Sequence, residues 1–207
     1  MANFRNVGMA PGELICWAFC GYVVFVASRA GTSGNHSNFS AMNMTRDEVY
    51  AARDTFLNLP GGTGSTGVSS WEIPSFLRQL GVTPAYEAYY LTGGPGASYA
   101  TATALRSRIN ALYRLRPGTP GIIVPTLHRG SGGICTDYGH VVVVWLGDQP
   151  DMYWVYDPNP LPGVPDPADH LSQMPQVDFA QRAAGTACAR GIIHPYLSPS
   201  ELRALPL

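Results

Sequence analysis

One apolar segment near the start of the chain limits the possible folds more than any other feature. Residues 14–28 have the sequence LICWAFCGYVVFVAS, without a charged side chain. The segment has about 15 residues, whereas a membrane-spanning helix needs about 20, so no membrane span is predicted. Pro11 and Gly12 precede it and Gly31 follows it. We therefore expect a buried helix over residues 15–29.

Further helix signals occur up to residue 117. Thr45 and Glu48 form a capping box that predicts a helix to about residue 58. Ser69 and Glu72 form a second box, which predicts a short helix that stops at Gly81. Helical spacing then predicts a third long helix with a buried face made of Ala104, Leu105, Ile109, Leu112 and Leu115.

Strand signals dominate the second half of the chain. Segments rich in β-branched and aromatic residues predict strands at 84–91, 121–127, 141–146, 152–156 and 191–193. The proline-rich segment 158–175 predicts no regular structure. Helices followed by strands indicate an α+β fold with an antiparallel sheet. We expect one domain over residues 1–207, with a helical part at about 12–115 and a sheet part at about 120–195.

The composition excludes some classes of partner. The net charge is -1 and the 13 Lys and Arg residues are scattered, which argues against a nucleic-acid partner. The four cysteines are too few for a disulfide scaffold of this length, so reduced thiols are expected. The first residues lack the pattern of a secretory signal, so no Sec-type export is predicted and the compartment stays open.

Three residues are candidates for nucleophilic catalysis. Cys16 falls in the first turn of the apolar helix, where unpaired N–H groups and the helix dipole stabilise a thiolate. His140 stands immediately before the strand at 141–146, and Asp157 ends the following strand, before Pro158. A hairpin between these strands brings the two residues together. We therefore predict that Cys16 is the nucleophile, His140 its base and Asp157 the residue that orients the base.

The sequence around these residues resembles a known class of enzymes. The run Cys16-Trp17-Ala18-Phe19 is similar to the segment around the nucleophile of papain-like cysteine proteases. The layout LRPGTPGIIVP, DYGHVVVVWLGD and YWVYDPNP resembles bacterial C39-like peptidases and AvrRpt2-like effector proteases, in which the orienting Asp commonly precedes Pro. The resemblance spans about residues 10–160. It implies a papain-like fold, in which a central N-terminal helix carries the nucleophile and packs on a C-terminal antiparallel sheet.

The chain departs from this family at the oxyanion site. The family usually has a Gln about six residues before the nucleophile, but Ala10 occupies that position and no Gln precedes Cys16. The oxyanion site must therefore combine the Cys16 backbone N–H with another donor, for which Asn6 or Asn3 are candidates. Loss of one such donor typically costs about 100- to 1,000-fold in rate.

Several alternatives stay open at this stage. The leading hypothesis is a thiol peptidase that acts on a protein or peptide substrate and that an inhibitor or immunity protein could control. A glutamine deamidase, a transglutaminase-like enzyme or an amidase toxin could use the same triad, and a non-catalytic binding module could share the fold. No cofactor is implied. No metal site is predicted either, because the cysteines and His140 lack a second closely spaced pair of ligands.

The remaining candidate residues are interpreted as structural. Cys20 is expected to pack in the core one turn after Cys16. Trp17 is expected to pack its helix on the sheet, and Trp145 or Trp154 to lie near the cleft. The other histidines are expected at the surface or in loops: His36, His128, His170 and His194.

Overall fold

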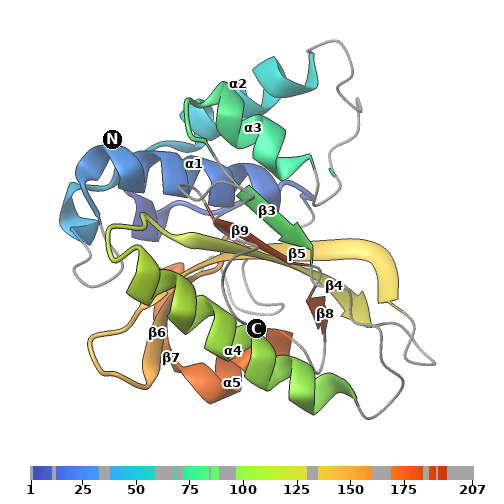
Figure 1. Cartoon of the computed structure of the whole chain (residues 1–207). Coiled ribbons are helices and arrows are strands. Elements are labelled where there is room, and N and C mark those ends of the chain that lie inside the picture. The colour runs from blue at the N-terminus through green and yellow to red at the C-terminus, as the bar shows by residue number, and fades with distance from the viewer. Residues whose placement is uncertain are drawn as a thin grey trace.

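Helices cover both faces of one antiparallel sheet, which places the chain in the α+β class (Figure 1). The computed structural model describes residues 2–10, 13–32, 38–58, 68, 72–83, 85–88, 97–129, 135–159, 169–183, 187–189 and 191–194. One face of the sheet carries α1 (Cys16–Ala30), α2 (Arg46–Leu57) and α3 (Ile73–Gln79). The other face carries α4 (Ala97–Leu115) and α5 (Gln176–Gln181).

The main sheet has seven strands in the order β3-β9-β4-β5-β6-β7, with β8 also paired to β4. Every pairing is antiparallel, as the sequence predicts. The strands are β3 (Ala85–Ala88), β4 (Ile122–Arg129), β5 (Cys135–Leu146), β6 (Met152–Tyr156), β7 (Leu171–Pro175), β8 (Ala187–Ala189) and β9 (Gly191–His194). Two short strands near the N-terminus, β1 (Ala2–Asn3) and β2 (Asn43–Met44), form a separate pair beside the 3-10 turns η1 (Phe4–Asn6) and η2 (Phe39–Ala41).

Local signals explain the helices. The apolar segment forms α1, which begins one residue later than expected and ends before Gly31. Thr45 and Glu48 make both hydrogen bonds of a capping box at the start of α2, so this prediction is confirmed. The second predicted box is wrong, because α3 begins at Ile73 and Glu72 is its N-cap without a side-chain bond.

The centre of the sheet is buried on both faces. Along β5 the side chains alternate: Val141, Val143 and Trp145 pack on the α1 side, whereas Val142 and Val144 pack on the α4 side. This double burial explains why the sequence of the strand is an unbroken apolar run. It also fixes the strand between two helical layers, so its position relative to α1 is well determined.

Three expectations about the chain after residue 96 need correction, and two elements were not predicted. Strand β5 begins at Cys135, so His140 lies inside the strand and not before it. The proline-rich segment contains strand β7, and α5 and β8 were not predicted. In α4 the side chains of Ala104 and Leu115 are exposed, and the buried set is Ala102, Leu105, Arg108, Ile109, Leu112 and Tyr113.

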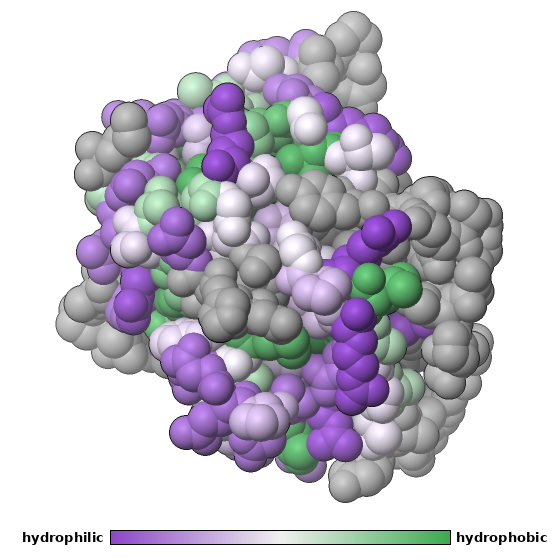
Figure 2. Space-filling model, turned by 60° about the vertical axis from the view of Figure 1, so that its left-hand side comes forward, coloured by the Kyte–Doolittle hydropathy of each residue, from purple (hydrophilic) through white to green (hydrophobic). Residues whose placement is uncertain are grey.

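The surface shows few large apolar side chains. Among the described residues, Leu14, Leu115 and Val177 are the exposed large hydrophobic ones. On the face drawn in Figure 2, apolar residues reach the surface in small patches between hydrophilic ones. Within the described part of the chain, no helix combines the length and the apolarity that crossing a membrane requires.

Gly121 provides a test of the packing at the start of β4. It has φ 139°, and a Cβ added there would lie 2.7 Å from Val143 Cγ1. We expect Gly121→Ala to lower the free energy of unfolding by about 1–3 kcal/mol, because it overfills the core and strains the backbone. Gly118→Ala is the matched control, since a Cβ at this exposed position meets nothing within 4 Å. Equal unfolding midpoints in urea for the two variants would contradict this account.

Candidate active site

Cys16 occupies the first position of α1, after the N-cap residue Ile15. Its side chain is almost buried, with a relative exposure of 6%. The chain leading to it is tied down by Glu13, whose Oε2 accepts the Ala10 N–H at 2.7 Å and the Tyr50 hydroxyl at 3.1 Å. Tyr50 belongs to α2. The start of α1 is therefore anchored to a second helix as well as to the sheet.

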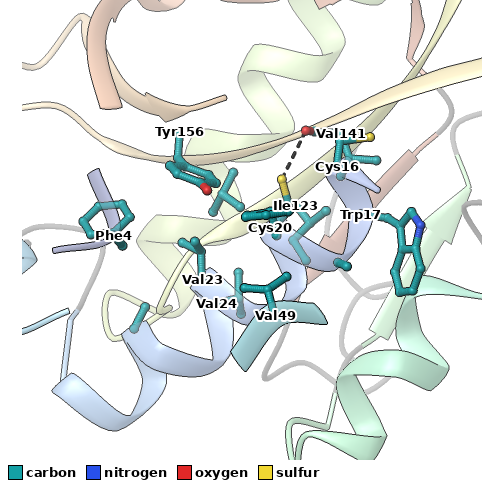
Figure 3. Packing of buried hydrophobic residues seen from close by; sticks show 14 of the residues in the cluster. Phe4, Cys16, Trp17, Cys20, Val23, Val24, Val49, Ile123, Val141 and Tyr156 are labelled. Atoms are coloured by element: carbon teal, nitrogen blue, oxygen red, sulfur yellow. Dashed lines mark hydrogen bonds between the residues drawn. The ribbon is translucent and has the colours of Figure 1, made fainter. Parts of the chain in front are cut away.

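Cys20 joins α1 directly to strand β5. Its thiol donates to the Val141 carbonyl oxygen at 3.1 Å, and the side chain is fully buried. Figure 3 shows this contact one turn into α1, with Cys16 at the end of the helix. Burial, reinforced by the negative charges of Cys16 and Asp157, raises the pKa of Cys20 well above its ordinary value. Cys20 is therefore a neutral packing thiol, in agreement with the expected core position.

His140 and Asp157 meet across the β5–β6 hairpin. The register pairs Val143 of β5 with Tyr156 of β6, and Asp157 is the next residue along the chain. This pairing brings Asp157 beside the part of β5 that holds His140. The His140 Nε2 and Asp157 Oδ1 atoms lie 2.7 Å apart, with side-chain exposures of 18% and 41%.

Cys16 completes the group. Cys16 is near enough to His140 to favour the protonated imidazole, as Asp157 does. Asp157 contacts Nε2, so we expect the thiol to act on Nδ1, the other ring nitrogen. The structure thus brings together Cys16, His140 and Asp157 in the order that the sequence predicts. Their catalytic roles remain predictions.

Opposing effects set the charge of His140. Burial disfavours the imidazolium and lowers its pKa, but the hydrogen bonds to Asp157 and Cys16, together with the negative charge of both groups, raise it more. The net result raises the pKa of His140 from 6.5 to about 10. The surroundings therefore favour a protonated ring at neutral pH, which is the form that a thiolate–imidazolium pair requires.

The candidate oxyanion donors have different positions. Asn3 is engaged elsewhere, because its Nδ2 donates to the Phe39 carbonyl oxygen at 2.7 Å. Asn6 is exposed at the end of η1. The Ala10 N–H donates to Glu13, so it does not replace the family's Gln. Among these candidates, Asn6 is the one whose side chain is not already committed to another described hydrogen bond.

Three tryptophan expectations need correction. Trp17 packs on Phe56 of α2 and Phe76 of α3, at centroid distances of 5.7 and 5.0 Å, where we expected the sheet. Trp145 and Trp154 both contact Phe39, near the N-terminal strands. They lie toward the far end of β5 and β6 from His140 and Asp157, so they do not line the site.

One histidine was placed wrongly, and one backbone contact was missed. His170 is buried, with 4% exposure, and its Nδ1 lies 3.0 Å from the Asp157 carbonyl oxygen. The Asn159 N–H donates to Asp157 Oδ1 at 2.9 Å. The pattern Asp-Pro-Asn is typical of a turn around an Asp side chain and could have indicated the contact between Asn159 and Asp157. His128 and His194 belong to strands, and His36 lies outside the described residues.

Comparisons with known proteins add no family assignment. No protein-family model matches the sequence, and no curated protein matches it significantly. Within the described residues, no group of three or more His, Cys, Asp or Glu side chains has the arrangement of a metal site. Any function inferred for this site therefore depends on the geometry of Cys16, His140 and Asp157.

The charge of His140 can be measured by NMR titration of its imidazole. We expect the wild-type ring to stay protonated well above pH 6.5, and Asp157→Ala to lower its pKa strongly, because burial then acts with less opposition. Asp157→Asn should give an intermediate value. Since the folded pKa exceeds the unfolded one, the stability that His140 contributes is complete below about pH 6.5 and is lost as the pH rises through about 10. A wild-type midpoint near 6.5 would contradict this description.

Proposed function

We propose that this protein is a papain-like cysteine peptidase that cleaves peptide or isopeptide bonds through Cys16, His140 and Asp157. One observation carries the proposal: a single imidazole lies 2.7 Å from a carboxylate oxygen and close to a thiol at the start of a helix. This is the arrangement of nucleophile, base and orienting group that covalent catalysis requires.

The fold gives independent support to the papain-like assignment. An N-terminal helix carries Cys16 and packs directly on the antiparallel strand that carries His140. The orienting residue follows the next strand of the same sheet. The nucleophile and its base therefore belong to different layers, so a substrate bound at the edge where these layers meet would contact both.

The chemistry follows from the positions of the protons. The Cys16 thiolate attacks the carbonyl carbon of the scissile amide, and the negative charge moves to the carbonyl oxygen. His140 Nδ1–H donates its proton to the departing amine, which leaves an acyl-enzyme thioester. The neutral ring then takes a proton from water, whose oxygen attacks the thioester, and the thiolate returns. Asp157 holds the ring through Nε2 during both steps.

The oxyanion donors are part of the proposal. The developing charge lies near the start of α1, where the Cys16 N–H and the positive end of the helix dipole are available. Asn6 is the proposed side-chain donor. Because Ala10 has no side-chain amide, we expect this protein to be a slower peptidase than a homologue with Gln at this position.

Alkylation by iodoacetamide tests whether His140 activates Cys16. We expect Cys16 of the wild-type protein to react faster with iodoacetamide in mildly acidic solution than an ordinary thiol does, because an imidazolium beside it favours the reactive thiolate. His140→Ala should slow this reaction, although the helix dipole remains. Cys16→Ala is the control, because buried Cys20 should not react in the folded protein. A wild-type rate equal to that of an ordinary thiol, unchanged by His140→Ala, would exclude the mechanism.

A peptide library analysed by mass spectrometry tests the reaction itself. We expect new peptide termini with wild-type protein and none with Cys16→Ala. Cys20→Ala should retain cleavage but unfold more easily, by about 1–3 kcal/mol, because it loses the buried bond to Val141. Glutamine-to-glutamate conversion without new termini would instead identify a deamidase that uses the same residues.

A further inference from the structure

The backbone of Asp157 is held by one residue, His170. The Asp157 N–H donates to the His170 carbonyl oxygen at 2.9 Å, which extends the β6–β7 ladder by one pair. The His170 side chain returns to the same residue, with Nδ1 at 3.0 Å from the Asp157 carbonyl oxygen. A carbonyl oxygen can only accept, so Nδ1 carries the proton in this contact. Both backbone polar groups of Asp157 are therefore bound to His170.

The His170 ring is itself confined by the N-terminal segment. Its backbone N–H donates to the Arg5 carbonyl oxygen at 2.6 Å. A Cβ on Gly8 would lie 2.1 Å from His170 Cε1, so the ring lies against the Gly8 backbone. Gly8 is held in turn by Arg46, whose Nε donates to the Gly8 carbonyl oxygen at 2.6 Å. The ring has little freedom to turn away from Asp157.

This support matters because the Asp157 carboxylate has little packing of its own. Its side chain is 41% exposed, yet Oδ1 must accept from His140 at 2.7 Å and from the Asn159 N–H at 2.9 Å. A short Asp side chain follows its backbone closely, because only two rotatable bonds separate Cα from the carboxylate oxygens. The position of Oδ1 therefore depends on how firmly the Asp157 backbone is held.

We propose that His170 is a positioning residue of the Cys16–His140–Asp157 site, acting through the Asp157 backbone, and that Gly8 provides the space its ring needs. This inference rests on the proposed function for its catalytic meaning. The structural link has a readout of its own, however, because the described groups that set the charge of His140 include Asp157 after β6 as well as Cys16 from α1. Displacement of Asp157 weakens the hydrogen bond and the attraction that favour the imidazolium.

The experiment compares two replacements of His170 by NMR titration of His140 in protein with 15N-labelled histidine. His170→Leu removes the donor to Asp157 and should lower the His140 midpoint by about one pH unit. His170→Asn retains a donor near the position of Nδ1 and should restore most of that shift. Gly8→Ala should act like His170→Leu, because its Cβ displaces the ring.

Gln176→Leu is the matched control for a loss of stability alone. Gln176 is also buried and hydrogen-bonded, but to Asn110 and to carbonyl groups at the β5–β6 turn, away from Asp157. We expect this variant to unfold more easily while its His140 midpoint stays at the wild-type value. A purely structural role for His170 would give the same pattern in His170→Leu.

Two outcomes would overturn the inference. One is a folded His170→Leu or Gly8→Ala protein with a wild-type His140 midpoint. The other needs no variant: 15N shifts that place the His170 proton on Nε2 in the wild-type protein. If wild-type Cys16 reacts as an ordinary thiol and no peptide is cleaved, the proposed function fails, but the His140 midpoints still test the link to His170. If wild-type protein is active and the midpoints do not move, the link alone fails.

Discussion

The packing of α1 on β5 is the contact on which the candidate site depends. Cys20 binds the Val141 carbonyl oxygen, and the apolar side chains around it close the interface. Cys16 lies one helical turn before Cys20, and His140 lies one residue before Val141. A turn advances a helix by about 5.4 Å, so a slip of even part of a turn along the strand would separate the thiol from the imidazole. The buried layer thereby sets the geometry of the polar group at its edge.

The two cysteines of α1 differ in their neighbours. Both are buried, and burial alone keeps a thiol neutral. Cys16 contacts His140, which Asp157 supports, whereas Cys20 contacts a carbonyl oxygen. A buried ion pair is tolerated only when hydrogen bonds satisfy both partners, and exposure of the outermost partner reduces the desolvation cost. The site follows this rule, because its carboxylate is the most exposed of the three groups.

Several features that depend on neighbours along the chain could be predicted from the sequence. The Thr45–Glu48 box, the apolar length of α1 and the turn after β5 depend on local chemistry, and each matches the structure. The contact of His140 with Asp157 was predictable because one hairpin joins them. The predicted capping box of Ser69 and Glu72 failed although it is a local signal, because α3 begins later, at Ile73, with Pro74 in its first turn.

Long-range pairing explains what could not be predicted. Strand β7 contains Pro175, and a proline in a sequence usually indicates a loop. β7 is an edge strand, however, where the missing N–H of a proline is tolerated. The β6–β7 pairing brings His170 to Asp157, and the N-terminal segment, more than 160 positions away, packs against its ring. The polar residues around His170 in the sequence therefore suggested an exposed position, whereas the side chain is buried. Catalytic candidates can be recognised by their own chemistry, whereas the residues that hold them acquire their role from contacts between distant segments.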